Sequence, residues 1–196
     1  MKSIKIRNIG KRLLLFLLII ELAYISYLLI PIVEAWGSYG RWNSPPYPNL
    51  SYANTCDGVE YDAVNTALGD WESIDATNPP NFYEYDPDNP NEPHISIWDP
   101  YEGGVNWDGR CTAYLSNGYI IFAEIEINEY YTSSPSYDFN AVRSVAGHEI
   151  GHALGLTDQP IDAKVLMNEN TGYRCFEYGI YKPTDDEVDA INSLYP

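Results

Sequence analysis

The stretch that decides the fold is His148-Glu149-Ile150-Gly151-His152-Ala153-Leu154-Gly155-Leu156-Thr157-Asp158. His148 and His152 are four residues apart, and on an α-helix this spacing places both imidazole rings on one face, one turn apart. Two rings in that position can bind one zinc ion through nitrogen. The stretch therefore predicts a helix that carries two metal ligands.

The remaining polar residues of this stretch complete a candidate catalytic site. Glu149 follows the first histidine, where its carboxylate can reach a metal-bound water without binding the metal. Gly155 accepts the left-handed backbone of a helix end, so the chain can turn back there. That turn can bring Asp158 to the metal as third ligand, although an aspartate after a turn also serves as a turn cap. Three protein ligands and one open position are typical of a catalytic zinc site.

The pattern His148-Glu149-x-x-His152-x-x-Gly155-x-x-Asp158 resembles the signature of the metzincin zinc peptidases, which usually have histidine at the last position. The snapalysin-like peptidases are similar to this chain in having aspartate there. The resemblance implies that His148, His152 and Asp158 bind a catalytic Zn²⁺ and that Glu149 activates the zinc-bound water. It also implies an endopeptidase that hydrolyses peptide bonds of protein or peptide substrates.

Met167 extends the resemblance. The chain has two methionines, and the one that is not the initiator lies in Val165-Leu166-Met167-Asn168, shortly after Asp158. Metzincins are named for a methionine-containing turn beneath the zinc at about this distance. The resemblance implies that Met167 forms this Met-turn, and the alternative is that Met167 only fills the core.

The pattern of apolar residues predicts an α+β fold. Strands are expected at 50–54, 94–98 and 119–128, and helices at 59–74, 139–156 and 184–195. Asp138 and the capping box from Thr184 to Glu187 are expected to begin the last two helices, and Trp71 is expected in the core. The resemblance to matrixin-like domains implies a metzincin-like zincin domain: a small twisted mixed sheet with a backing helix, an active-site helix, the Met-turn and a C-terminal helix.

The segment 119–128 alternates most clearly, and Ile121, Ala123, Ile125 and Ile127 are expected on one face. In metzincins the edge strand of the sheet pairs with the backbone of the substrate. Whether 113–117 or 119–128 forms that edge stays open at this stage.

Residues 1–35 are predicted to be a targeting segment. A basic start precedes an apolar run from Leu13 to Val33. Val33-Glu34-Ala35 offers small residues to a signal peptidase, and the run is also close to the length of a membrane span. We expect a signal peptide or an N-terminal membrane anchor, then an extended arm over 36–49 and a metallopeptidase catalytic domain over 50–196. The domain would be secreted, or anchored to the outer face of the membrane by residues 13–33.

The chain is strongly acidic, with 28 Asp and Glu against 11 Lys and Arg and a net charge of −17. Such a surface repels nucleic acid and anionic lipid, so a nucleic-acid partner is not expected. Asp86, Asp88, Asn89 and Asn91 lie in an expected loop over 75–93 and offer oxygen ligands for Ca²⁺. Their spacing does not match the loop of an EF-hand, which favours a solvated loop there.

Three cysteines are present: Cys56, Cys111 and Cys175. An exported chain folds in an oxidising compartment, so one disulfide is expected, with Cys111–Cys175 the favoured pair.

Two alternatives stay open beside the peptidase. In the first, the chain is a catalytically silent exported or membrane-tethered binding module whose fold the metal stabilises; the intact Glu149 argues against it. In the second, His94 replaces Asp158 as third ligand. A lone histidine near a strand start is usually structural, which favours Asp158.

Overall fold

The structure is a computed structural model that describes residues 37–43, 48–88 and 92–196. The expected signal peptide or anchor over 1–35 lies outside the described residues, as do Asn89 and Asn91 of the candidate calcium loop. Of the expected arm over 36–49, residues 37–43, 48 and 49 are described.

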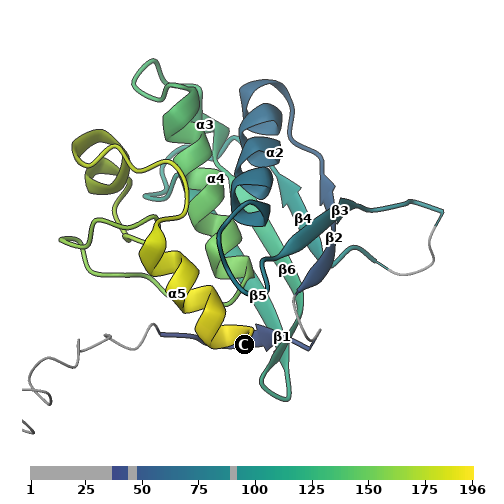
Figure 1. Ribbon diagram of the computed structural model, residues 1–196. Helices are drawn as coiled ribbons and strands as arrows, with labels where there is room; N and C mark the ends of the chain where they lie inside the picture. Colours follow the sequence, from purple (N-terminus) through teal and green to yellow (C-terminus); the bar gives the residue numbers. More distant parts are fainter. Residues whose placement is uncertain (1–36, 44–47, 89–91) are drawn as a thin grey trace, which may run out of the picture. The chain divides into compact units, whose positions relative to one another are not determined.

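A six-stranded mixed sheet forms one layer of the domain, in the order β1-β6-β4-β2-β3, with β5 paired to β6 (Figure 1). The strands are β1 Arg41–Trp42, β2 Asn49–Asn54, β3 Asn81–Glu84, β4 Ile95–Trp98, β5 Gly109–Ser116 and β6 Tyr119–Ile127. Only the β5–β6 pairing is antiparallel among the described strands. Since β5 pairs there with β6 alone, β5 is the edge strand that the sequence left undecided.

The helices confirm the α+β class. They are α2 Gly58–Glu72, α3 Glu129–Thr132, α4 Phe139–Ala153, the π-helix η1 Gly172–Glu177 and α5 Asp185–Leu194. Helices α2 and α4 lie side by side against the sheet (Figure 1). Trp71 of α2 is fully buried between them, and its indole N–H donates to the Gly147 carbonyl of α4 at 2.9 Å. The expected backing helix and active-site helix are therefore joined by packing and by a hydrogen bond.

Both predicted helix caps are confirmed. The Asp138 side chain accepts a hydrogen bond from the Ala141 N–H at 2.9 Å and begins α4. Thr184 and Glu187 form the capping box of α5. Each cap satisfies N–H groups that have no partner within the first turn of a helix.

The predicted face of β6 is wrong at Ile121, which is 57% exposed, whereas Ile120 is buried. The cause is a bulge in the β5–β6 ladder. Tyr114 pairs with Phe122 and the next residue, Leu115, pairs with Ile120, so Ile121 is left over. An extra residue in one strand exchanges the two faces beyond it.

Two segments that the sequence predicts to be irregular contain short strands. The expected loop over 75–93 contains β3, which extends the sheet beyond β2. Residues 37–43 are not a free arm, because they run along the end of α4. The Trp42 indole N–H donates to the Ala153 carbonyl at 2.8 Å, and Arg41 and Trp42 pair with the start of β6.

The expected disulfide is not formed. Cys56, Cys111 and Cys175 are free thiols in the structure. They lie in three different parts of the chain: Cys56 precedes α2, Cys111 is on β5 and Cys175 is on η1.

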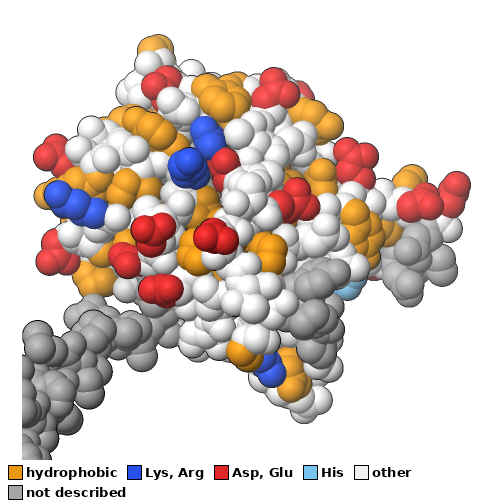
Figure 2. All heavy atoms as spheres, viewed as in Figure 1, with side chains coloured by type: hydrophobic (Ala, Val, Ile, Leu, Met, Phe, Trp, Pro, Cys, Tyr) orange, Lys and Arg blue, Asp and Glu red, His pale blue; other side chains and the backbone are white. Residues whose placement is uncertain are grey.

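The described surface agrees with the acidic composition. On the face in Figure 2, acidic side chains are spread widely, whereas Lys and Arg form a few small groups. Among the described helices, none has the length and apolarity that a membrane crossing requires.

Gly151 permits the closest packing of α4, and its replacement tests this contact. A Cβ at Gly151 would lie 2.3 Å from the Met167 sulfur and 3.1 Å from the Trp71 ring. We expect Gly151→Ala to lower the free energy of unfolding by about 1–3 kcal/mol, the usual cost of overpacking a core. Urea unfolding of the metal-free protein measures the change.

The matched control is Gly69→Ala on α2, where an added Cβ meets no atom within 4 Å. Since alanine favours helix more than glycine, this change should raise stability by up to about 1 kcal/mol. Equal effects of the two substitutions would contradict the packing argument.

Candidate metal centre

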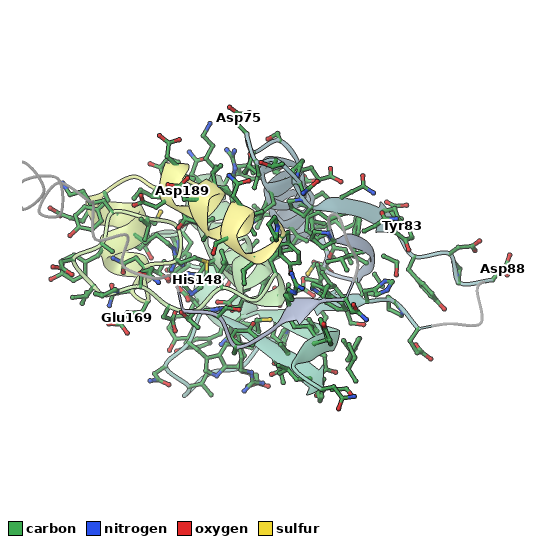
Figure 3. All side chains as sticks on the ribbon, turned by 60° about the horizontal axis from the view of Figure 1, so that its bottom comes forward. Asp75, Tyr83, Asp88, His148, Glu169 and Asp189 are labelled. Atoms are coloured by element: carbon green, nitrogen blue, oxygen red, sulfur yellow. The ribbon has the colours of Figure 1, made fainter. Side chains whose placement is uncertain are left out.

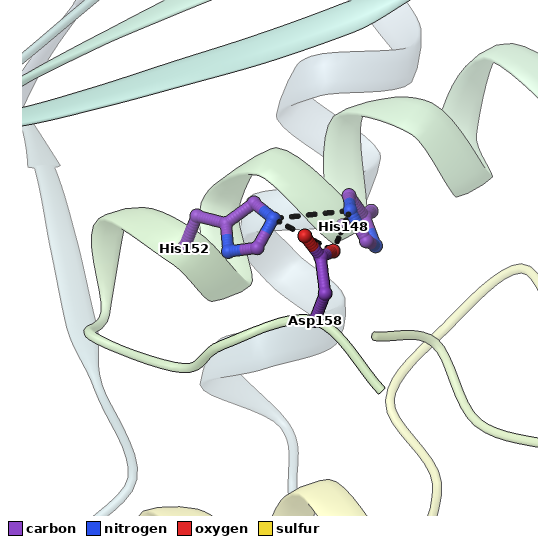
Figure 4. A group of neighbouring side chains, drawn as sticks. All are labelled: His148, His152 and Asp158. Carbon is purple, nitrogen blue, oxygen red and sulfur yellow. Dashed lines mark hydrogen bonds and ion pairs between the residues drawn. The ribbon is translucent and has the colours of Figure 1, made fainter. Parts of the chain in front are cut away.

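Three side chains meet at the C-terminal half of α4. His148 and His152 project from one face of the helix, and Asp158 reaches them from the following loop (Figure 4). The two Nε2 atoms are 3.1 Å apart, and Asp158 Oδ1 lies 3.2 Å from His148 Nε2 and 3.3 Å from His152 Nε2. Tetrahedral zinc with bonds of about 2.1 Å places its ligand atoms about 3.4 Å apart. The three atoms therefore have the spacing of one face of a zinc coordination sphere.

Backbone carbonyls fix the direction of both imidazole rings. His148 Nδ1 lies 3.0 Å from the Leu166 carbonyl, and His152 Nδ1 lies 2.8 Å from the Leu156 carbonyl. Since a carbonyl only accepts, both Nδ1 atoms donate to a carbonyl, and both Nε2 atoms face the Asp158 side, where a bound metal ion would replace any proton on them. Such outer hydrogen bonds hold the histidines of metal sites in one tautomer and one orientation.

A sharp turn at Gly155 brings Asp158 back over the helix. Gly155 has φ +102°, a left-handed conformation that suits glycine, and a Cβ there would lie 2.1 Å from the Gly40 carbonyl oxygen. The Thr157 N–H donates to the Gly37 carbonyl at 3.1 Å. The N-terminal segment thus fixes the loop that carries the third candidate ligand.

Met167 lies directly beneath this part of α4. Its side chain is fully buried, and its sulfur approaches Gly151, which lies between the two histidines in the sequence. The Met167 N–H donates to Glu187 Oε1 at 3.0 Å, and its carbonyl accepts from the Gln159 N–H at 2.7 Å. Glu187 is fully buried and belongs to the capping box of α5, so the C-terminal helix holds the turn that supports the site.

Glu149 is buried beside the candidate ligands. Burial raises the pKa of its carboxyl to about 7, although His152 and Arg174 act in the opposite direction. Its position depends on Gly109 at the start of β5, because a Cβ there would lie 2.7 Å from Glu149 Oε1. A carboxyl with this pKa can both accept and donate a proton near neutral pH.

The charges of the three candidate ligands are coupled. Burial lowers the pKa of His148 to about 4. Burial also opposes the charge of His152, but its hydrogen bond to Asp158 and the nearby Glu149 raise its pKa. The two histidines hold the pKa of Asp158 well below its usual range. At neutral pH the cluster therefore offers a neutral His148 and an ionised Asp158, as a metal site requires.

These residues line a cavity of about 300 Å³ beside the edge strand. The lining residues are Asn106, Trp107, Asp108, Gly109, Arg110, Cys111, His148, Glu149, His152, Asp158, Glu169, Thr171 and Arg174. In Figure 3, His148 lies among the packed elements, whereas Glu169 lies at the periphery. Glu149 and the three candidate ligands therefore line one cavity.

The structure brings all four sequence-predicted site residues together and leaves His94 elsewhere. His94 Nδ1 accepts the Ser51 N–H at 3.0 Å, and its ring packs edge-on against Trp42. Arg174 and Gly109 line the cavity and were missed by the sequence reasoning. Neither belongs to a motif, and only the path of the chain places them there.

Comparison with known proteins identifies a family. The family model described as Matrixin matches residues 58–196. A search of the curated proteins finds no match. Among solved structures, a chain of the "GM1 bound form of the ECX AB5 holotoxin" is similar at 13% sequence identity with a TM-score of 0.48, over 81% of this chain and 87% of that chain. A likeness of this size carries no argument about function.

Removal of Asp158 tests the candidate metal centre. Loss of an outer-shell partner typically lowers metal affinity about 10–100-fold, so loss of a ligand should cost at least as much. We expect Asp158→Ala to lower zinc affinity about 100-fold or more, measured by competition with a chromophoric chelator.

Asp162→Ala is the matched control, because Asp162 is an exposed carboxylate in the same loop. Its zinc affinity should equal that of the unchanged protein. Unaltered zinc binding by Asp158→Ala would show that Asp158 is not a ligand.

Proposed function

The chain belongs to the matrixin family of zinc metallopeptidases, and on that premise we propose that it is an exported endopeptidase whose zinc ion is held by His148, His152 and Asp158. As a matrixin, the protein is a hydrolase that acts on peptide bonds of proteins or peptides. The observation that carries the ligand assignment is the spacing of the three ligand atoms, together with the two carbonyls that direct both Nε2 atoms to one point.

Glu149 acts as general base and then as general acid in this proposal. When bound, zinc supplies a Lewis acid that polarises the scissile carbonyl and lowers the pKa of a water molecule. The Glu149 carboxylate accepts a proton from the attacking water and delivers it to the leaving amine. Its raised pKa supports both steps, because the same group must change protonation near neutral pH.

The edge strand β5 positions the substrate. Its outer side pairs with no other described strand, and its first residue, Gly109, packs against Glu149. An extended peptide that adds to this edge would satisfy free backbone groups and lie across the cavity beside the ligand cluster. The absence of a side chain at Gly109 leaves room for the Glu149 carboxyl next to such a peptide.

Met167 forms the Met-turn in this proposal. The turn contacts the site at two points, since the Leu166 carbonyl orients His148 and the Met167 sulfur packs under Gly151. Its role is to hold the ligands rigidly, because a firm first coordination sphere binds metal more tightly.

Export is part of the proposal and rests on the sequence of residues 1–35. The basic start, the apolar run and the small residues before Trp36 support a signal peptide or a membrane anchor. Either one places the catalytic domain outside the cytoplasmic membrane.

The direct test of the peptidase is cleavage of a mixed peptide library by the zinc-loaded protein beside Glu149→Gln. We expect cleavage that a chelator abolishes and that the substitution lowers about 10²–10⁴-fold, the usual contribution of a general base. Both proteins should bind one zinc ion. Bound zinc without cleavage in the unchanged protein would favour a catalytically silent module, and equal cleavage by both proteins would exclude Glu149 as the base.

The pH dependence of kcat/KM tests the protonation state of Glu149. The base must be ionised, and its pKa of about 7 in the metal-free protein falls when a dication lies nearby. We therefore expect activity to rise with pH along an acidic limb whose midpoint lies below about 7. The profile is measured at saturating zinc from about pH 5 to 8. Activity that falls as the pH rises over this range would contradict the assignment.

A further inference from the structure

Arg174 gives the candidate active-site cavity a buried positive charge that the proposed chemistry does not use. The side chain lies on η1, is 1% exposed and lines the same cavity as His148 and Glu149. Burial of a guanidinium away from water is unfavourable unless an anion balances its charge. Its presence at the wall of a substrate cavity therefore needs an explanation.

Neutral groups hold the guanidinium in place. Arg174 Nε donates to Ser144 Oγ at 3.0 Å, Nη1 donates to the Asn168 carbonyl at 2.6 Å, and Nη2 donates to Thr171 Oγ1 at 2.9 Å. These are three acceptors for five N–H groups, and none carries a charge. The guanidinium fork of Arg174 is thus fixed between α4 and the segment after Met167. None of the groups that it contacts carries a negative charge.

Two other arginines, Arg143 and Arg110, have carboxylate partners. Arg143 makes a two-pronged ion pair with Asp70, with both N–O distances at 2.6 Å. Arg110 pairs with Glu126 at 2.6 Å. Arg174 is the most deeply buried of the three, and within the described part of the chain no carboxylate lies in ion-pair range of it.

None of the four carboxylates that line the cavity forms an ion pair with Arg174. Asp158 contacts the two histidines, and Asp108 accepts the Tyr137 hydroxyl at 2.6 Å. Burial lowers the pKa of Arg174, and the charges of Asp108 and Glu149 oppose that shift from beyond contact distance. Glu169 is exposed and points outward (Figure 3). A ligand carboxylate that enters the cavity would be the first anion to contact the fork.

We propose that Arg174 is a specificity-determining residue that makes this cavity select substrates with an acidic side chain next to the scissile bond. The inference rests on the proposed peptidase function. A guanidinium that is already oriented and dehydrated loses little on binding a carboxylate, whereas a neutral or cationic side chain leaves its charge uncompensated.

The test compares peptides that differ only in one residue beside the cleaved bond: Glu, Gln, Leu or Lys, placed in turn on either side. The zinc-loaded full chain should cleave the best Glu peptide about tenfold or more faster in kcat/KM than its Gln partner, since a hydrogen bond between two charged groups is stronger than one to a neutral amide. The ratio should fall with added salt. Equal rates for Glu and Gln on both sides would overturn the inference.

Variants assign the preference to one residue. Arg174→Met keeps most of the volume and removes the charge, so the Glu-to-Gln ratio should fall to about one, while Arg174→Lys should keep part of the preference. Arg110→Met removes a cavity cation that already has a partner, so the ratio should persist. Zinc content and melting temperature verify that each variant is folded. A retained preference in a folded Arg174→Met would overturn the inference, and if that variant does not fold, the peptide and salt series on the unchanged protein decides.

Binding separates this inference from the peptidase proposal. Calorimetry with zinc-loaded Glu149→Gln compares the affinity of the Glu and Gln peptides without turnover. Tighter binding of the Glu peptide supports the acidic site even when no peptide is cleaved, an outcome that would contradict the peptidase proposal alone. Cleavage without any acidic preference would contradict the Arg174 inference alone.

Discussion

The hydrogen bond from His148 Nδ1 to the Leu166 carbonyl is the contact on which the site depends. It joins the helix that carries the two histidines to the turn that contains Met167, and it directs His148 Nε2 toward Asp158. The corresponding hydrogen bond from His152 Nδ1 to the Leu156 carbonyl joins α4 to the start of the segment that carries Asp158. Neither carbonyl can donate a proton, so two backbone groups decide which nitrogen atoms are free for a metal ion. The ligand triangle is therefore a property of the backbone around α4 as much as of its side chains.

Distant parts of the chain converge on this loop. Glu187, at the start of the C-terminal helix, accepts the Met167 N–H with one carboxylate oxygen and caps its own helix with the other. At the other end of the described chain, a Cβ at Gly37 would lie 2.3 Å from Thr157 Oγ1, and a Cβ at Gly155 would lie 2.1 Å from the Gly40 carbonyl oxygen, so both positions require glycine. Segments from both ends of the described chain support one loop. Loss of either contact should therefore alter the positions of the candidate ligands.

Electrostatics gives the cavity a character different from that of the surface. The surface is strongly acidic, yet Asp158, Asp108 and Glu126 are engaged by histidines, a tyrosine and a paired arginine, respectively. Arg174 stands out because its contacts are all neutral. A buried charge is stable only where the surrounding fold holds it, and here η1 and α4 do so. Net charge alone would point to cationic substrates, whereas the local arrangement favours anionic ones next to the scissile bond.

Local patterns were sufficient for much of the fold and for all four proposed functional residues. The spacing of His148, Glu149 and His152, the caps of α4 and α5 and the burial of Trp71 follow from helix geometry, which depends on near neighbours in sequence. The same reasoning failed at Ile121, because the bulge there depends on the pairing with β5. It also failed at residues 81–84, because their local sequence does not indicate that they pair with β2. It also failed for the cysteines, because the path of the chain decides which residues meet.

What the sequence by itself determined, then, is the identity and spacing of the residues around the candidate metal centre, since one helix and one turn set them. Only the tertiary structure decided which strand lies at the sheet edge beside the cavity, which carbonyls orient the histidines and that Arg174 lines the cavity. These features join residues far apart in the chain, and their positions depend on packing between elements rather than on the preference of any one segment.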